Sequence, residues 1–288
     1  MNRLSTEQRA RIIGCLVEGN SIRTTVRLTG AAKNTISKLL LDLGSACSAY
    51  QDDALRNLTC ERIQLDEIWS FVGCKKKNVD PERHSADWGD AWTFTALDPD
   101  TKLVPSWFVG QRTADDAWEV LADLRARLAG KVQLSTDGHK MYLTAVPEVL
   151  GDDVDYAQVV KHYGRKPADP ENHRYSPAPC VTVTINKVSG TPDPAHISTS
   201  LVERQNLTIR MSMRRFTRLT NAFSRKLENL TAAVSLHFMF YNFGRPHQTL
   251  TKRAGGVKTT PAMAAGVADH VWSLTEIAVL LDSYEHSN

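Results

Sequence analysis

The sequence of 288 residues lacks the features that assign many proteins to a class at once. Its five cysteines form no C-x-x-C pair, so the sequence indicates neither a zinc knuckle nor a disulfide framework. The N-terminus carries no apolar signal region, and no segment approaches the roughly 20 apolar residues of a membrane-spanning helix. We therefore expect a cytoplasmic protein that makes no use of a membrane.

A second absence concerns acidic residues. The net charge of +3 is too small to indicate nucleic-acid binding by itself, but no acidic residue occurs between Arg204 and Lys226. That span holds seven basic residues, namely Arg204, Arg210, Arg214, Arg215, Arg218, Arg225 and Lys226. Because the guanidinium fork matches the geometry of phosphate oxygens, we interpret the span as a contact to the DNA backbone. A solvated basic surface is the alternative.

Residues 1–45 form the first predicted domain. A capping box at Ser5 starts a first helix, and a turn at Gly30 separates a second helix from a third over 33–43. Two helices joined by a tight glycine-containing turn are typical of a helix-turn-helix, whose second helix enters the major groove. The residues that this helix offers to DNA are Lys33, Asn34, Thr35, Ser37 and Lys38. The alternative is a three-helix cap without DNA contact, and 46–61 is expected to be a linker.

Residues 62–250 read as one α/β domain. Apolar, β-rich runs and helical spacing predict, in chain order, strands over 63–72, 91–97 and 103–109, a helix over 113–129, a strand over 132–136, a helix over 142–150 and a strand over 154–160. Three strands in a meander followed by helix, strand, helix and strand is the order of a ribonuclease-H-like mixed sheet. Residues 164–196, which hold half of the twelve prolines, are expected to be an insertion with one strand over 181–188. Helix is expected after Ser200 and over 224–242, and 251–288 is expected to be a C-terminal helical tail.

Three acidic residues stand out by their context. Asp66 interrupts the first strand, Asp137 ends the fourth, and Glu203 lies near the start of a helix. A carboxylate in apolar surroundings costs free energy unless something pairs with it, and magnesium prefers hard oxygen ligands. The expected sheet order puts the first and fourth strands side by side, so Asp66 and Asp137 could share a metal. Each acid also has a structural interpretation. Asp66 would be a charge at the strand edge, with Glu67 the more important neighbour. Asp137 would belong to a turn, and Glu203 to a capping box that begins at Ser200.

The basic span supports the same site. If one helix continues from Glu203, then Arg210, Arg214 and Arg218 return to about the same face as that carboxylate. This face would hold the DNA backbone against the acids. A break in the helix near 214–216 is the alternative, and it would place Arg218 elsewhere.

Several linked strings resemble a known family. They are 66–73 (DEIWSFVG), 136–138 (TDG) and 203–207 (ERQNL), followed by 241–250 (YNFGRPHQTL) and 260–262 (TPA). Together they resemble the DDE transposases of bacterial insertion sequences, with the IS-one family as the best match. The resemblance runs from the helix-turn-helix to about residue 265. One departure is that some members carry a cysteine-rich zinc element before the helix-turn-helix, which this sequence lacks.

The resemblance implies a function and a site. Asp66, Asp137 and Glu203 resemble the metal-binding DDE triad, with two Mg²⁺ ions as cofactor and Mn²⁺ as a possible substitute. The implied activity is cleavage of double-stranded DNA at the element's ends and transfer of the freed 3′-hydroxyl to target DNA. A homodimer or larger assembly is implied because an element has two ends, and the protein would be associated with the nucleoid when bound. A metal-dependent nuclease that cuts without joining, and a DNA-binding regulator with a silent catalytic domain, are the alternatives.

Overall fold

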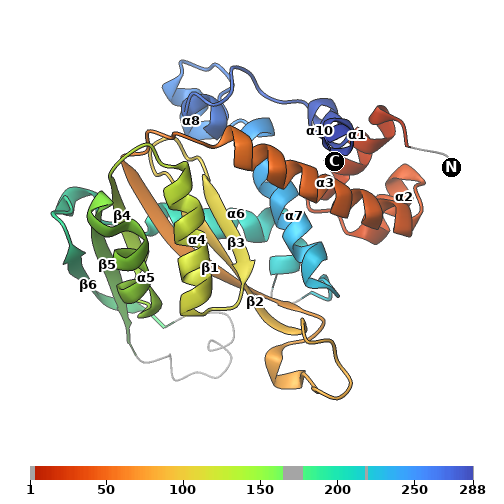
Figure 1. Ribbon diagram of the computed structural model, residues 1–288. Coiled ribbons are helices and arrows are strands. Elements are labelled where there is room, and N and C mark those ends of the chain that lie inside the picture. The colour runs from red at the N-terminus through yellow and green to blue at the C-terminus, as the bar shows by residue number, and fades with distance from the viewer. Residues whose placement is uncertain (1–3, 165–177, 218–219, 288) are drawn as a thin grey trace.

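The computed structural model describes residues 4–164, 178–217 and 220–287. Its centre is a six-stranded mixed sheet in the order β3-β2-β1-β4-β5-β6 (Figure 1). The strands in chain order are β1 (Arg62–Val72), β2 (Gly89–Leu97), β3 (Ser106–Gly110), β4 (Val132–Asp137), β5 (Val154–Tyr163) and β6 (Cys180–Ser189). The described helices are α1 (Thr6–Val17), α2 (Ile22–Thr29), α3 (Lys33–Ala54), α4 (Ala114–Arg127), α5 (Met141–Leu150), α6 (Ser200–Ser212), α7 (Leu227–Met239), α8 (Gln248–Arg253), α9 (Pro261–Ala264) and α10 (Leu274–Ser287).

The strand directions confirm the predicted fold class. β1, β2 and β3 form an antiparallel meander, whereas β4 and β5 run parallel to β1 on its other side. This arrangement of five strands is ribonuclease-H-like, and β6 adds an antiparallel edge to β5. The strand predicted over 181–188 is therefore present as β6, while 165–177 of the predicted insertion lie outside the described residues.

The two faces of the sheet have separate cores. α4 and α5 cover one face, where Leu65 and Phe94 of the sheet join Leu121 and Tyr142 in one apolar cluster (Figure 1). The other face packs on α6 and α7 through a second cluster that also includes α1, α3 and α10. Alternation of side chains along β1 explains this division, because successive residues of a strand point to opposite faces.

The N-terminal helices begin and turn as their sequence predicts. Ser5 and Gln8 form a reciprocal capping box at the start of α1. Gly30 ends α2 in the left-handed conformation, with φ of 73°, which glycine adopts without steric cost. Ser21 accepts a hydrogen bond from the Thr24 backbone and caps α2. α2 and α3 are therefore joined by a short turn at Gly30, as predicted.

The predicted end of the third helix is wrong. α3 continues without interruption to Ala54, through most of the segment that was expected to be a loose linker. Gly44 does not stop the helix but lets α7 approach it, because a Cβ at Gly44 would lie 2.5 Å from the Cβ of Ala232. Ser235 of α7 also donates a hydrogen bond of 2.7 Å to the Gly44 carbonyl oxygen. The glycine therefore serves helix packing.

Helices in the last part of the chain fasten the N-terminal unit. Within the segment 251–288, which was expected to be a helical tail, α10 lies against α1 (Figure 1). The buried guanidinium of Arg9 forms an ion pair of 2.7 Å with Asp282 and donates to the Ala278 carbonyl oxygen. α3 in turn packs on α7, so helices from the two ends of the chain pack together. Within the described ranges, no helix combines the length and apolarity that a bilayer crossing requires.

The third strand is shorter than the prediction over 103–109. The backbone of Val104 does not join the sheet ladder, because Asn242 accepts from its N–H over 3.0 Å and donates to its carbonyl oxygen over 2.9 Å. The Tyr241 hydroxyl likewise donates to the Lys102 carbonyl oxygen over 3.0 Å. Both residues lie where α7 passes into a π-helical turn, Phe240–Gly244, so the YNFG string braces the loop before β3.

Candidate metal centre

Two neighbouring strands bring Asp66 and Asp137 together. Leu65 of β1 lies opposite Thr136 of β4 in the parallel register, so the next residue of each strand carries a carboxylate at the same level. Asp137 is the last residue of β4, where the strand gives way to a turn. The adjacency of the first and fourth strands, predicted from the element order, is therefore present in the structure.

A third carboxylate joins them from the same strand. Asp66, Glu67 and Asp137 each offer an oxygen atom, and these atoms lie within 4.8 Å of one another. Glu67 does not belong to the predicted triad, and its only predicted importance is as the neighbour of Asp66 in the structural interpretation. Three carboxylates this close repel one another unless a proton or a cation is shared between them.

Burial and that repulsion both raise the pKa of the Asp66 and Glu67 carboxyl groups. Burial, followed by the charge of Asp137, raises the pKa of Asp66 to about 6. Burial and Asp137 also raise the pKa of Glu67 to about 7, although Tyr142 and Arg112 act in the opposite direction. Shifts of this kind cluster at functional sites, where they reflect charges that need a partner.

Two donors from other elements saturate Glu67. Arg112, which follows β3, donates to Glu67 Oε2 over 3.0 Å, and the Tyr142 hydroxyl of α5 donates to Oε1. The Glu67 side chain has no exposed surface. Arg112 stacks over the Trp92 ring and also reaches Asp137 Oδ2 over 3.2 Å. Glu67 is thus the anchor that holds a bridging arginine beside Asp137.

The role of Arg112 leaves no signal in the local sequence. This residue follows a short strand and stands alone, without a second basic residue or a recognisable motif beside it. Its place between two carboxylates depends on the pairing of three strands, which no local pattern records. Asp137 also has a local role, since its Oδ1 accepts from the His139 backbone N–H over 2.9 Å. The turn interpretation of Asp137 and its place in the cluster are therefore compatible.

Helix α6 is fixed against β1 at the same place. Gln64 of β1 accepts hydrogen bonds of 3.0 Å from the backbone N–H groups of Leu201 and Val202, which satisfies the open donors of the helix start. One turn later, Asn206 Nδ2 donates to Asp66 Oδ2 over 2.8 Å. Asn206 Oδ1 is buried and has no hydrogen-bond partner among the described residues. A site whose available ligand atoms are all oxygens, with a buried amide oxygen that has no hydrogen-bond partner among the described residues, fits a hard divalent cation.

Glu203 lies on α6 close to this group but outside it. Its Oε1 accepts from Lys161 of β5 and from the Thr199 hydroxyl, the latter over 2.6 Å. Its charge still contributes to the raised pKa of Asp66. The predicted capping box from Ser200 to Glu203 is wrong, because Thr199 is the N-cap residue and Gln64 supplies the capping oxygen.

The arginines predicted to share a helix face with Glu203 do so only in part. α6 carries Glu203 and Arg210 but ends at Ser212, and Arg214 lies in a separate 3₁₀ turn, Arg214–Phe216. The alternative of a helix break at this point is therefore the correct one. Arg218 lies outside the described residues. Because the main chain leaves the helical path at Met213, Arg214 does not continue the α6 face that carries Glu203.

The predicted DNA-reading residues lie at the start of α3. Four of the five are exposed, and Ser37 is half-buried. Lys38 forms an ion pair with Asp42 one turn further along the helix. The exposed residues are Lys33, Asn34, Thr35 and Lys38. Their contact with DNA stays a prediction.

Comparison with known proteins gives distant similarity only. The chain matches no protein-family model, and no curated protein is significantly similar to it in sequence. Among solved structures it is similar to a Mos1 transposase paired-end complex with the left transposon end, with 13% identity, a TM-score of 0.24, and coverage of 54% of this chain and 60% of that one. A Mos1 mariner paired-end complex with Mn has 9% identity, a TM-score of 0.31 and coverage of 99% and 78%. The chain spans about 60% of the length of the first structure.

Proposed function

We propose that this protein is a DNA transposase of the DDE type, which cuts DNA at the ends of an insertion sequence and joins the freed ends to target DNA. The observation that carries the proposal is the group of carboxylate oxygens within 4.8 Å where β1 passes the end of β4. Such a group on a ribonuclease-H-like sheet suits a divalent cation and a phosphodiester. The linked strings around Asp66, Asp137 and Glu203 add the resemblance to DDE transposases.

The ligand set that we propose is Asp66, Asp137 and Glu203. Both oxygens of Glu67 already accept hydrogen bonds, and its side chain has no exposed surface, so it suits a positioning role. The Glu203 side chain is 41% exposed, and its contacts with other described residues use Oε1 only. Its second oxygen can therefore turn to a ligand without breaking a hydrogen bond.

The carboxylates favour Mg²⁺, with Mn²⁺ as a substitute, because both ions accept oxygen ligands. When bound, the cation supplies charge neutralisation at the phosphate and a lower pKa of a water molecule. Asn206 orients Asp66, and Arg112 orients Asp137 while reducing the repulsion between carboxylates. Arg210, on the helix that carries Glu203, suits contact with the DNA backbone. The reaction exchanges one phosphodiester oxygen for another at each step, so it needs no ATP.

DNA recognition is assigned to the start of α3. Lys33, Asn34, Thr35, Ser37 and Lys38 offer the amide, hydroxyl and ammonium donors that read base edges and phosphates in the major groove. Since an element has two ends, we propose that a homodimer or larger assembly acts on DNA in the cytoplasm, at the nucleoid.

The test uses oligonucleotides copied from the DNA that flanks the gene. Purified protein is incubated with them and Mg²⁺, and nicked and joined products are resolved. We expect cleavage at a repeat boundary with joining, lost in Glu203→Gln and reduced about 10- to 100-fold in Glu67→Gln, as for residues that orient metal ligands. Loss of cleavage in Glu67→Gln, with cleavage retained in Glu203→Gln, would make Glu67 the metal ligand and Glu203 the positioning residue. Cleavage without joining would instead identify a metal-dependent nuclease.

A further inference from the structure

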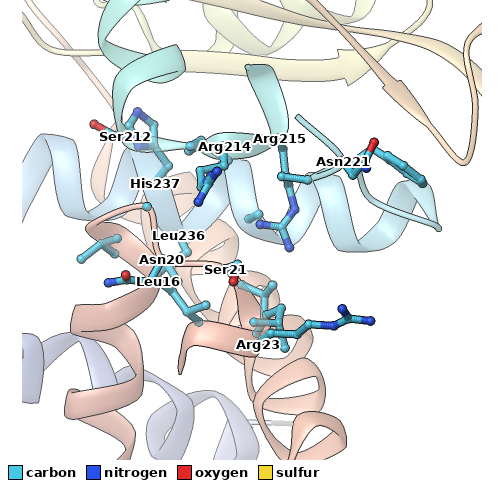
Figure 2. Close-up of a pocket in the computed structure, with 18 of the residues that line it drawn as sticks. Leu16, Asn20, Ser21, Arg23, Ser212, Arg214, Arg215, Asn221, Leu236 and His237 are labelled. Atoms are coloured by element: carbon cyan, nitrogen blue, oxygen red, sulfur yellow. The ribbon is translucent and has the colours of Figure 1, made fainter. Parts of the chain in front are cut away.

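A second charged region lies away from the acidic centre, in a cavity of about 710 Å³. Its walls are the turn between α1 and α2, the start of α3, the chain that follows α6, and one face of α7 (Figure 2). Arg214 and Arg215 extend from the chain after α6 toward Ser21 and Arg23 on the opposite wall (Figure 2). We call this space the cationic cavity.

The charges of the cationic cavity all have one sign. Its lining includes no Asp or Glu among the described residues, and no ion pair between described residues involves any of its five cations. The cations are Arg23, Lys33, Arg214, Arg215 and Arg225. Like charges gathered around one cavity repel one another, so an anion that enters it lowers their electrostatic energy.

Two polar groups in the cavity wall have unused hydrogen-bonding capacity. His237 of α7 is only 5% exposed, and its Nε2 has no partner among the described residues. Burial lowers the pKa of its ring to about 3, so the ring is neutral and adds no charge of its own. Arg215 donates to Ser224 through Nε alone, over 2.9 Å, which leaves the outer guanidinium nitrogens for a ligand. Both groups suit phosphate oxygens.

The position of the cavity indicates which phosphate-bearing molecule fits. One wall of the cavity includes Lys33, the first residue of α3, which is the helix proposed for DNA recognition. The opposite wall is the chain that follows the C-terminal end of α6. The N-terminal end of α6 carries Glu203 and Asn206 at the acidic centre. A helix of 13 residues spans about 20 Å at 1.5 Å per residue, roughly the length of six base pairs. A duplex held by α3 and cut at the acidic centre would therefore pass the cavity.

We propose that the cationic cavity binds the phosphodiester backbone of the DNA between the part contacted by α3 and the part at the acidic centre. The cavity thereby sets the distance between the recognised sequence and the cleaved bond. This inference rests on the proposed function, because it takes DNA as the substrate. It adds Arg23, Arg215 and Arg225 to the residues that hold DNA.

The test measures how the affinity of the full chain for a fluorescent mixed-sequence duplex depends on salt, in EDTA and without any cleavage. Each phosphate contact contributes about 0.9 to the slope of log affinity against log salt. Arg23→Gln combined with Arg225→Gln removes one exposed cation from each wall, and we expect the slope to fall by about 1.8. The matched control, Lys252→Gln with Lys258→Gln, removes two exposed cations from the C-terminal tail and should keep the slope.

The outcomes separate this inference from the proposed function. An unchanged slope in the cavity variant, or an equal fall in the control, overturns the inference even if the wild-type protein cleaves DNA. Competition by inorganic phosphate without a change of slope would assign the cavity to a small anion and also overturn it. A fall confined to the cavity variant supports it, and a wild-type slope in Arg23→Lys combined with Arg225→Lys, which keeps both charges, assigns the fall to the lost charge. If that fall occurs but cleavage is never detected, the proposed function fails while DNA binding in the cavity stands.

Discussion

Helix α6 connects two regions that differ in how their charges are balanced. At its start, the carboxylates of Asp66, Glu67 and Asp137 are surrounded by donors from Arg112, Tyr142 and Asn206. At its end, the cationic cavity gathers arginines for which the described residues supply no carboxylate. The acidic centre is therefore held in one geometry before any ligand binds, whereas the cavity has charge without a fixed arrangement. We expect single atoms to decide activity at the first, and total charge to decide affinity at the second.

The largest expected effect tests the acidic centre. Asp66→Asn keeps the shape of the side chain but removes a proposed metal ligand, which we expect to lower cleavage by about 1,000-fold, equivalent to about 4 kcal/mol. The salt slope of DNA binding should stay as in the wild type, because the cationic cavity is untouched. Single-turnover cleavage and fluorescence anisotropy measure the two quantities.

The matched control for that substitution is Asp115→Asn. Asp115 is an exposed acid in the first turn of α4 and belongs to neither region. Its substitution should leave both cleavage and DNA binding unchanged. If Asp66→Asn retained cleavage within a few-fold of the wild type, the assignment of this carboxylate as a ligand would be wrong.

The next effect is a pH dependence that only the acidic centre should have. The pKa of Glu67 is raised from 4.5 to about 7 and that of Asp66 from 3.8 to about 6, so the folded state binds protons more tightly than the unfolded state. The metal-free protein should therefore be most stable at acidic pH and lose stability as the pH rises through this window. A shift of two pKa units corresponds to about 3 kcal/mol.

Urea unfolding in EDTA from pH 5 to pH 8 measures this slope. Mn²⁺ should flatten it, because a bound cation takes the place of the protons. Glu67→Gln should also flatten it, since the substitution removes one titrating carboxyl and keeps a polar side chain beside Arg112 and Tyr142. A metal-free protein that gains stability with pH would show that these carboxylates are already balanced by charge.

Local patterns in the sequence were sufficient for most of the fold. The apolar, β-rich run of β1 and the helical spacing of α4 predict elements whose observed bounds, Arg62–Val72 and Ala114–Arg127, differ by at most two residues from expectation. The order of these elements then gave the adjacency of Asp66 and Asp137, because the connections of a ribonuclease-H-like sheet place their strands side by side. Periodicity and order are properties of neighbours in the chain, so a single sequence records them.

What the sequence did not predict depends on contacts between distant segments. Gly44 follows the predicted end of the third helix, yet in the structure its lack of a Cβ allows α7 to pack closely on α3. Arg112 and Tyr142 meet Glu67 only after the sheet and α5 have formed. Lys161 pairs with Glu203 across a gap of 42 residues, which no spacing rule reports. These errors share one cause, since each side chain is used by a partner that is remote in sequence.

A smaller effect tests how the two regions are held relative to each other. Gly44→Ala should destabilise the protein by about 2 kcal/mol, although alanine normally favours a helix by about 1 kcal/mol over glycine. The added Cβ would lie 2.5 Å from the Ala232 Cβ and push α3 away from α7, which together form walls of the cationic cavity. Urea unfolding measures the loss of stability.

Gly130→Ala is the control for this substitution. Apart from its neighbours in the chain, no heavy atom of the described residues lies within 4 Å of a Cβ built at Gly130, and its φ is not in the left-handed region. We expect little change in stability there. Equal stability of both variants would mean that α3 and α7 can separate without cost, in which case the cavity would not have a fixed width.

The smallest effect concerns the contact that holds Glu203 at the edge of the acidic centre. Lys161 donates to Glu203 Oε1, and under the proposed ligand set it would compete with a metal ion for this carboxylate. Lys161→Met removes that competitor, and half-exposed ion pairs contribute at most about 1 kcal/mol, so Mn²⁺ should bind up to about five-fold more tightly. Lys131→Met breaks a similar ion pair of 2.8 Å to Asp155, on the same sheet, and should not change the affinity. Weaker binding in Lys161→Met would instead show that the lysine presents Glu203 to the metal. Titration calorimetry separates these results because it reports the affinity without requiring DNA or cleavage.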